Sequence, residues 1–369
     1  ESLSRCHPER SEGSAAFHAT SHRYHGHGPL PPTTEADPSL RPGRQCRNQE
    51  RQAAEATIPP ITIHAMSSTD PSAHHPPLGP RHWPTWLGIG TMALAARLPW
   101  PAQRVLGRMI GALLHALLRE RRAVAARNLA LCFPALDDAA RAALLREHFA
   151  ALGIGLFEFA RAWWGSIAPM RKGLVVEGLE HLEAARAGGR GVIVVSGHFI
   201  TLEMCGRLMC DYAPLAGMYR PHAEPAMEWA VRRGRARYAA AMFPKQDVRG
   251  AVRHLKKGGL LWYAPDQDPS RGDAVFVPFF GHPAHSLTST HALARLSGAA
   301  VVLYQHRRRP DGGYTLTLRP ALEDFPSDDA TADTARVIAG IETMVRAAPE
   351  QYLWIHRRFK RQPDGSSVY

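Results

Sequence analysis

The sequence predicts an α/β fold with a largely parallel central sheet flanked by helices, preceded by an N-terminal membrane-anchoring helical segment. The α/β part follows from residue 174 onward, where short apolar runs alternate with helix-length segments. The anchoring part follows from an uncharged, Trp-rich segment that begins at Trp83. We therefore divide the chain into a tail (residues 1–80), an anchor (81–103) and a domain large enough to be an enzyme (104–369).

The tail has the composition of a disordered segment. It is rich in Pro, His, Ser, Arg and Gly and shows no hydrophobic period. It also lacks the basic start, apolar middle and small-residue cleavage site of a secretory signal. The first methionine is Met66, so we expect Met66 to be the natural start and residues 1–65 to be an over-extended translation.

The expected anchor is short. The stretch from Trp83 to Ala96 carries no charge, but a spanning helix needs about 20 apolar residues, and Pro99 and Pro101 should end this one. The segment is therefore a short single anchor or an interfacial helix, with a buried core helix as the alternative. Residues 104–122 follow as an amphipathic helix that either lies on an anionic membrane or packs inside the domain.

The remaining elements follow from periodicity. A long helix is expected over residues 137–164, capped near Asp137 or Asp138. The expected strands are residues 174–178, 191–197, 259–265, 274–280, 299–305 and 314–320, and the expected helices between and after them are 201–209, 225–240, 248–258, 287–298 and 331–347.

Composition limits the partners. The net charge of +12 favours an anionic partner, such as nucleic acid, an acidic protein or a phosphate-bearing membrane. The basic residues are dispersed and form no nucleic-acid recognition motif, so we expect no nucleic-acid partner. The five cysteines form no Cys-x-x-Cys pair, which argues against a disulfide framework or a zinc site, and we expect neither a metal nor a cofactor.

One short motif places chemistry in the α/β part. A histidine followed five positions later by an acid occurs at His115, His198 and His306, and composition alone predicts about two such pairs. The first and last pairs are interpreted as solvated positions. His198 instead follows a buried-type strand, and ligands gather at the carboxyl ends of parallel strands.

The expected chemistry is general-base catalysis. Glu203 lies in the first turns of the next helix, where its carboxylate would bond one ring nitrogen of His198 and fix the tautomer. The other nitrogen would then take a proton from a hydroxyl nucleophile. A hydrogen-bonded core histidine at a strand end is the structural alternative.

Four ordered blocks resemble a known family. These are VIVVSGHFITLE, MYRPHAEPAMEWAVRRGRAR, WYAPDQDPSRGDAVFVPFFG and APEQYLWIHRRFKRQPDG, and RHWPTWLGIG near the anchor adds to them. Together they resemble the late acyltransferases of lipid A biosynthesis, nearest the lauroyltransferase type. The resemblance implies transfer of an acyl chain from acyl carrier protein to a hydroxyl on a hydroxyacyl chain of a Kdo-bearing lipid A precursor. It also implies a cell inner membrane location with the catalytic domain on the cytoplasmic side, and it makes His198 and Glu203 the catalytic motif.

The same blocks imply further substrate-binding residues. Arg220 is a candidate for a phosphate or oxyanion contact, because an arginine fork suits both. Asp266 and Asp268 follow an apolar strand and would position substrate or arginines. Arg357 and Arg358 would bind lipid phosphates or the acidic carrier protein, with a solvated terminal helix as the alternative.

Two rival functions stay open from the residues alone. A glycerophospholipid acyltransferase would share the His198 motif and differ in the later blocks. A basic membrane- or nucleic-acid-binding protein would explain the charge but gives no role to the motif.

Overall fold

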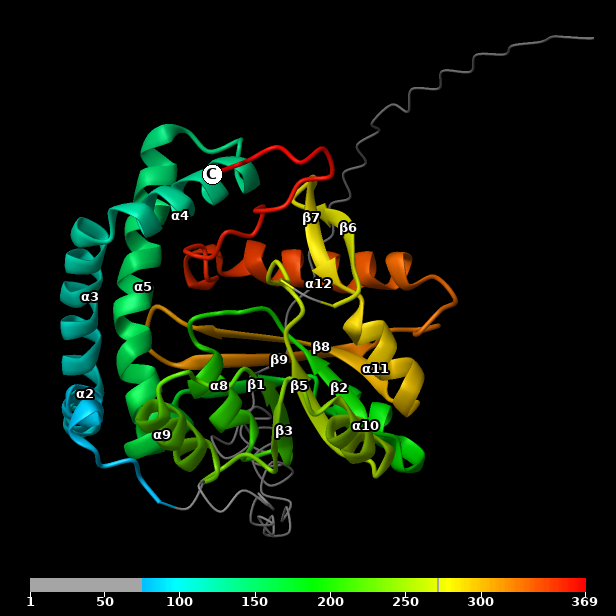
Figure 1. The fold of residues 1–369 in the computed structure, drawn as a ribbon, viewed down its shortest axis with the longest axis horizontal. Coiled ribbons are helices and arrows are strands. Elements are labelled where there is room, and N and C mark those ends of the chain that lie inside the picture. The colour runs from blue at the N-terminus through cyan, green and yellow to red at the C-terminus, as the bar shows by residue number, and fades with distance from the viewer. Residues whose placement is uncertain (1–74, 271) are drawn as a thin grey trace, which may run out of the picture. The chain divides into compact units, whose positions relative to one another are not determined.

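The computed structural model describes residues 75–270 and 272–369 of the chain. Its centre is a seven-stranded sheet with the order β1-β9-β8-β2-β5-β3-β4 (Figure 1). Neighbouring strands are parallel throughout, except for the antiparallel pair β8–β9. The predicted α/β fold with a largely parallel sheet flanked by helices is therefore confirmed.

The strands include every predicted one and three more. They are β1 (Leu174–Glu177), β2 (Val192–Val195), β3 (Leu215–Tyr219), β4 (Met242–Pro244), β5 (Leu260–Tyr263), β6 (Ala274–Phe279), β7 (His282–Leu287), β8 (Ala300–Arg308) and β9 (Tyr314–Ala321). Strands β3, β4 and β7 were not predicted from the sequence. The β6 segment was predicted as a strand, but it pairs with β7 in a separate antiparallel hairpin rather than joining the main sheet.

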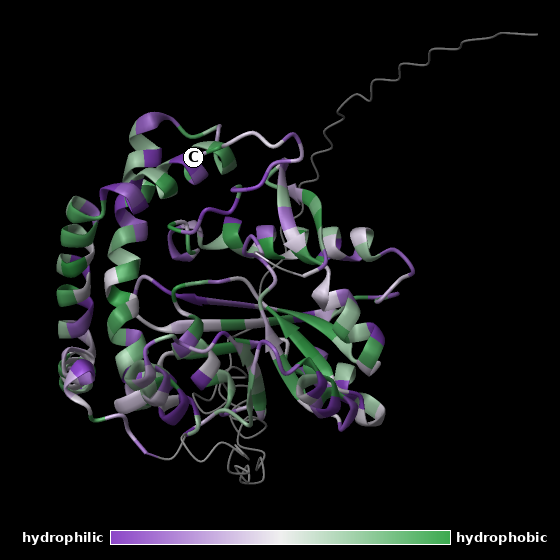
Figure 2. Cartoon of the chain, viewed as in Figure 1, coloured by the Kyte–Doolittle hydropathy of each residue, from purple (hydrophilic) through white to green (hydrophobic). Residues whose placement is uncertain are grey.

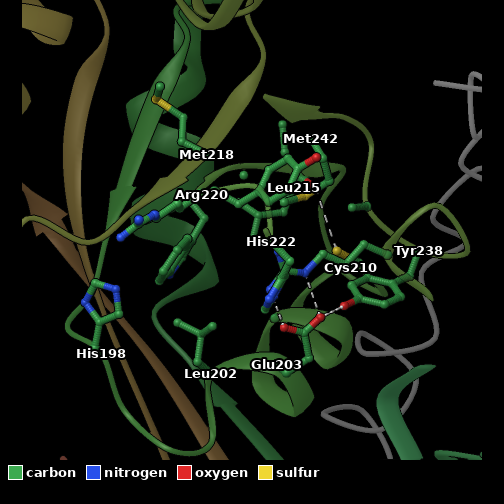
Figure 3. A pocket seen from close by; sticks show the side chains of 17 residues that line it. His198, Leu202, Glu203, Cys210, Leu215, Met218, Arg220, His222, Tyr238 and Met242 are labelled. Carbon is green, nitrogen blue, oxygen red and sulfur yellow. Dashed lines mark hydrogen bonds and ion pairs between the residues drawn. The ribbon is translucent and has the colours of Figure 1, made fainter. Parts of the chain in front are cut away.

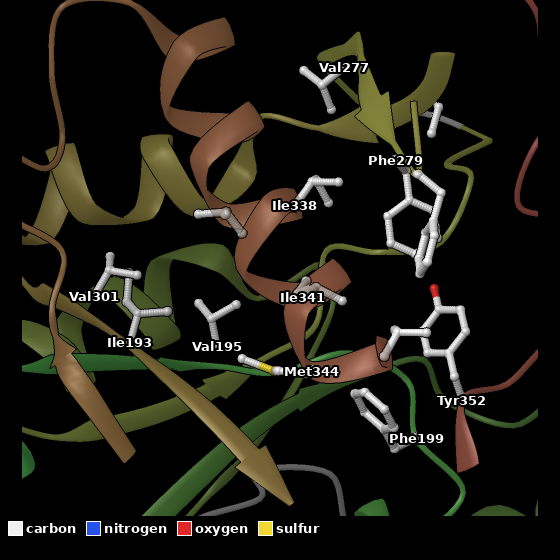
Figure 4. Packing of buried hydrophobic residues seen from close by; sticks show 14 of the residues in the cluster. Ile193, Val195, Phe199, Val277, Phe279, Val301, Ile338, Ile341, Met344 and Tyr352 are labelled. Atoms are coloured by element: carbon white, nitrogen blue, oxygen red, sulfur yellow. The ribbon is translucent and has the colours of Figure 1, made fainter. Parts of the chain in front are cut away.

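Strand β2 lies in the middle of the sheet and is buried on both faces. Ile193 and Val195 point into one core and Val192 and Val194 into the other. Unbroken Val/Ile runs are typical of parallel strands covered on both sides. Figure 4 shows the first core, where Ile193 and Val195 lie beneath the side chains of one long helix, including Ile341.

Helices cover both faces of the sheet. One core contains residues of α10 (Val248–Lys256), α11 (Ser289–Ser297) and α12 (Ala330–Ala347). The other contains residues of α6 (Ala168–Lys172), α7 (Leu179–Arg186), α8 (Leu202–Met209) and α9 (Pro225–Arg235). Helix α5 (Asp138–Trp164) contributes to both cores and begins where predicted, since the Asp137 carboxylate accepts a hydrogen bond from the Ala140 amide at 2.7 Å.

Between residues 75 and 132 the chain forms three α-helices. They are α2 (Trp83–Ala95), α3 (Trp100–Leu117) and α4 (Arg119–Cys132). The prolines separate α2 from α3 as expected, but the predicted helix over residues 104–122 is wrong as one unit, because Leu118 leaves the helical conformation at ψ 63°. No helix within residues 75–270 and 272–369 has the length and apolar character needed to cross a bilayer, so a transmembrane helix is not found there.

Helix α3 packs against α5 through glycines. A Cβ on Gly153 of α5 would lie 2.0 Å from the Gly107 carbonyl oxygen, and one on Gly111 would lie 2.3 Å from the Phe149 carbonyl oxygen. The helices therefore touch backbone to backbone. Four large apolar side chains of α3 face outward instead: Val105, Met109, Leu113 and Leu117 are all more than half exposed. Figure 2 shows much of this helix in green, the hydrophobic end of the scale.

The predicted division into tail, anchor and domain stays a prediction. Residues 1–74, with Met66 among them, lie outside the described residues. The last residues before α2 are held in place, because the indole nitrogens of Trp83 and Trp86 donate to the Leu78 and Pro77 carbonyls at 3.1 and 2.7 Å.

Candidate active site

A cavity of about 250 Å³ opens at the carboxyl ends of β2, β3 and β5 (Figure 3). His198 stands at one end of it and the Glu203 carboxylate lies further along the wall. The rest of the wall is mostly apolar and includes Leu202, Cys210, Leu215, Met218, Ala239, Met242 and Trp262. A hollow whose wall is apolar over much of its length is able to hold a hydrocarbon chain whose reactive end stops at a histidine.

His198 is held by a carboxylate. Its Nδ1 lies 2.6 Å from Asp266 Oδ1, and its backbone amide donates to Asp266 Oδ2 at 2.8 Å. One acid thus fixes both the ring and the main chain of the histidine. Because an ionised carboxylate only accepts hydrogen bonds, Nδ1 carries the proton and Nε2 is left as the basic nitrogen.

The environment keeps Asp266 ionised. Burial alone would raise the pKa of this fully buried carboxyl, but the charge of His198 and hydrogen bonds from His198 and Tyr352 hold the pKa at about 2. The carboxylate is therefore charged at any physiological pH. A charged carboxylate in this position is able to stabilise an imidazolium on His198.

The fold brings this pair together from two strands. His198 follows β2 and Asp266 follows β5, and the two strands are parallel neighbours in the sheet. A third segment completes the site, because the Leu353 amide donates to the His198 carbonyl at 3.0 Å and Tyr352 pairs with Phe199 in an isolated β-bridge.

Glu203 does not take the position that we expected for it. Its Oε1 and Oε2 accept a bidentate pair from Arg235 at 2.9 and 2.7 Å. The Trp163 indole donates to it at 2.6 Å, and the Tyr238 hydroxyl adds a further hydrogen bond. The expected bond from Glu203 to His198 is therefore corrected to one from Asp266, because α8 turns the Glu203 carboxylate toward α9 and α5.

The Glu203 cluster is a buried ion pair in the wall of the cavity. Burial would raise the pKa of Glu203, but the charge and hydrogen bonds of Arg235 outweigh it and lower the pKa. Burial and the Glu203 charge together raise the pKa of Tyr238 well above its usual range. Glu203 therefore stays ionised and fixes Arg235 and Tyr238, which both line the cavity.

The structure separates the other predicted site residues into three places. Arg220 lines the same cavity, and its guanidinium points toward the His198 end (Figure 3). Asp268 and Arg357 line a second cavity. Arg358 lies in the core, where it donates to the His285 carbonyl and to Ser286 Oγ at 2.7 and 2.6 Å. No helix forms around these arginines, so the alternative of a solvated terminal helix is not found.

In the two other His-x4-acid pairs, His115–Glu120 and His306–Asp311, no hydrogen bond or ion pair joins the histidine to the acid. Asp311 is exposed in the turn between β8 and β9, as expected. His306 was interpreted as solvated, and this is wrong: it is buried, bonds Thr201 Oγ1 at 2.9 Å, and burial lowers its pKa to about 3. It points inward because it lies on the β8 face that packs against α8.

Comparison with known proteins assigns the family. The family model for bacterial lipid A biosynthesis acyltransferases matches residues 72–361. The chain belongs to this family. It is therefore an acyltransferase of lipid A biosynthesis, as the resemblance implied.

Relatives of this acyltransferase align over nearly their whole length. The lipid A biosynthesis palmitoleoyltransferase of Escherichia coli K12 is 43% identical over 295 residues, covering 79% of this chain and 96% of that protein. The lipid A biosynthesis lauroyltransferase of the same organism is 39% identical over 290 residues, covering 78% and 95%. A lipid A biosynthesis acyltransferase of Haemophilus influenzae is 35% identical over 292 residues, covering 78% and 93%.

For four residues of the site, the sequence did not predict the contacts that the structure shows. Asp266 was named but not paired with His198, because strand order cannot be read from spacing. Trp163, Arg235 and Tyr238 gave no local signal, since they come from α5, α9 and the turn after α9. Within residues 75–270 and 272–369 no group of three or more His, Cys, Asp or Glu side chains converges on a possible metal position.

Proposed function

We propose that this acyltransferase moves a fatty acyl chain from acyl carrier protein to a hydroxyl of a hydroxyacyl chain on a Kdo-bearing lipid A precursor, with His198 as general base. The observation that carries the proposal is the His198–Asp266 pair at the end of an apolar cavity. Donor and acceptor follow from the family resemblance, and the geometry supports the reaction type.

The reaction that fits this geometry is direct acyl transfer. Nε2 of His198 takes the proton of the acceptor hydroxyl as its oxygen attacks the thioester carbonyl carbon. The tetrahedral intermediate collapses with cleavage of the carbon–sulfur bond. The imidazolium then returns its proton to the leaving thiolate, so the ester and the free thiol are the products. Asp266 holds the ring in the tautomer that this sequence requires.

Arg220 is the proposed oxyanion contact. It lines the cavity together with His198, and no ion pair among the described residues involves it. A guanidinium without a carboxylate partner is able to stabilise the negative charge that develops on the carbonyl oxygen. This assigns to Arg220 the second of the two roles that the sequence left open.

Glu203 is proposed as a positioning residue rather than as the partner of His198. Its ion pair with Arg235 and its bond to Tyr238 fix the polar part of the cavity wall. Beyond this wall the lining is apolar, with Leu215 and Met242 at the end away from His198 (Figure 3). The acyl chain of the donor would lie along this lining.

The outward apolar face of α3 is proposed to rest on the cytoplasmic side of the inner membrane. Val105, Met109, Leu113 and Leu117 recur at helical spacing on this face, and Arg104 and Arg108 lie on the same helix. An amphipathic helix with basic residues binds the headgroup boundary in plane. Replacing Met109 and Leu113 by Gln should reduce sedimentation with anionic vesicles several-fold. The matched variant Val175→Gln, at an exposed apolar position of β1, should sediment as the wild type, and equal sedimentation of all three proteins would reject this face.

The test of the function is a transfer assay. Lauroyl- and palmitoleoyl-acyl carrier proteins are offered to a Kdo-bearing tetra-acylated lipid A precursor, and the product mass is measured. The expected result is one added acyl chain, with activity lost in His198→Ala. A lysophosphatidic acid acceptor serves as the control for the glycerophospholipid alternative, and transfer to it alone would reject the proposed acceptor. Full activity in His198→Ala would reject the mechanism.

A further inference from the structure

A second cavity, of about 220 Å³, has Asp268, two residues after Asp266, in its wall and is strongly basic. It is lined by Arg121, Asp268, Ser270, His356, Arg357, Lys360 and Arg361. Four of these seven side chains carry a permanent positive charge and one carries a negative charge. The arginine of α4 and the three cations after residue 356 come from distant parts of the chain, so the fold gathers them around one hollow.

The positive charge of this cavity is only partly neutralised. Arg361 is paired with Asp268 at 3.1 Å. Arg357 meets Glu120 at 2.9 Å, but both side chains are well exposed, and such pairs contribute little. Arg121 contacts only the Ile355 carbonyl, at 3.4 Å, and within the described residues Lys360 has no hydrogen-bond or ion-pair partner. At least two cations therefore face the hollow without a strong internal partner.

The cavity is coupled to the catalytic site by a short loop. Asp266 holds His198, and two residues later the Asp268 amide donates to His356 Nε2 at 3.2 Å. Both His356 and Asp268 line the basic cavity. Burial lowers the pKa of His356 to about 4, so this ring is neutral and adds no charge of its own at physiological pH.

The two cavities lie on opposite faces of the sheet. The apolar cavity is lined by α8 and by residues near the end of α9, which pack into one core. The basic cavity is lined by α4 and the segment after Trp354, whose apolar neighbours belong to the other core. His198 lies at the carboxyl end of the strand between them.

We propose that the basic cavity binds a phosphate group of the glycolipid acceptor, with Arg121, Arg357 and Lys360 as its main contacts. The inference rests on the proposed function. A phosphate monoester carries up to two negative charges and three acceptor oxygens, which suits several cations converging from different segments. A concave site of this size fits one phosphate group better than the broad acidic surface of a carrier protein. Phosphate binding here would place the acceptor hydroxyl at His198 and select acceptors by their phosphate groups.

The test is the double variant Arg121→Gln/Lys360→Gln. The matched control is Arg249→Gln/Lys256→Gln, which removes the same charge from exposed positions of α10. With a phosphorylated acceptor, the double variant should raise KM roughly 10- to 100-fold, because it loses charged hydrogen bonds, while kcat changes little. With a dephosphorylated acceptor, the wild type and the double variant should have the same KM. The control should behave as the wild type with both acceptors.

Three further readouts show which substrate group causes the raised KM of the double variant. A raised KM for acyl carrier protein with an unchanged acceptor KM would assign the cavity to the carrier and overturn the proposal. An equal loss with both acceptors would also overturn it, since the phosphate would then play no part. Direct binding of the phosphorylated acceptor to His198→Ala, with and without the Arg121 and Lys360 changes, needs no turnover. Binding weakened only in the triple variant would support the phosphate site even if the transfer assay showed no acyl transfer.

Discussion

Replacement of Asp266 by Asn is the sharpest test of the site. The substitution keeps the size of the side chain and its ability to accept the hydrogen bond from the His198 amide at 2.8 Å. It replaces the charged acceptor that lies 2.6 Å from Nδ1 by an amide that can donate to this nitrogen. A donor there favours the tautomer with its proton on Nε2, where the base must be free.

The expected loss is large and affects kcat. The analogous change in the serine-protease triad costs about 10⁴-fold because of the wrong tautomer, and loss of general-base catalysis alone costs about 10²–10⁴-fold. We expect Asp266→Asn to lower kcat by roughly 10³–10⁴-fold, which corresponds to about 4–5 kcal/mol of transition-state stabilisation. The acceptor KM should change little, since Asp266 is buried behind His198.

The assay is the initial rate of acyl transfer at saturating donor and acceptor, with folding checked by thermal unfolding. Asp273→Asn makes the same change at an exposed carboxylate seven residues further on and should keep the wild-type rate. An Asp266→Asn rate within about tenfold of the wild type would refute the role of this carboxylate. A normal rate in Asp266→Asn together with complete loss in Glu203→Gln would restore the original pairing of Glu203 with His198.

Three further outcomes are expected. Glu203→Gln should lower the thermal midpoint clearly, because removing one partner of a buried ion pair costs about 3–5 kcal/mol, and an unchanged midpoint would contradict the Arg235 pairing. Gly153→Ala should destabilise the protein in urea unfolding, because the new Cβ would meet the Gly107 carbonyl oxygen at 2.0 Å, whereas Gly90→Ala in α2 meets nothing and should be neutral or slightly stabilising. Since the pKa of Asp266 is about 2 in the folded protein, below its ordinary 3.8, its contribution to stability is present above pH 4 and lost as the pH falls toward 2. At pH 3 the free energy of unfolding, measured by urea denaturation, should be about 1 kcal/mol lower than above pH 4 because of this group. Asp266→Asn should not show this part of the pH dependence.

The sequence was sufficient for most elements of the fold but not for their arrangement. Strand β2 could be predicted from its Val/Ile run. Helix α5 could be predicted from its helical period and its capping aspartate. Strands β3 and β4 could not, because β3 contains a glycine and β4 is only three residues long. The orientation of α3 was also hidden, because glycines rather than large side chains form its packing face.

The candidate site was predicted in its parts rather than in its contacts. His198 was chosen correctly as a strand-end residue, and Asp266 was placed at the end of another strand. Only the sheet order, with β5 beside β2, shows that these two ends meet. Glu203 was paired with His198 because of their spacing, but its carboxylate binds Arg235 instead. The two residues are 32 positions apart, so a five-residue pattern could not predict this contact.

The contact between the His198 loop and residues 351–353 imposes an order on the appearance of activity during synthesis. All strands of the sheet have been synthesised once the ribosome has passed β9, which ends at Ala321. At that stage His198 still lacks the Leu353 amide on its carbonyl, and Asp266 lacks the hydroxyl of Tyr352. The strands of the sheet are therefore synthesised before the residues that complete the catalytic loop. The His198–Asp266 pair gains its last contacts only when residues 352 and 353 have been made.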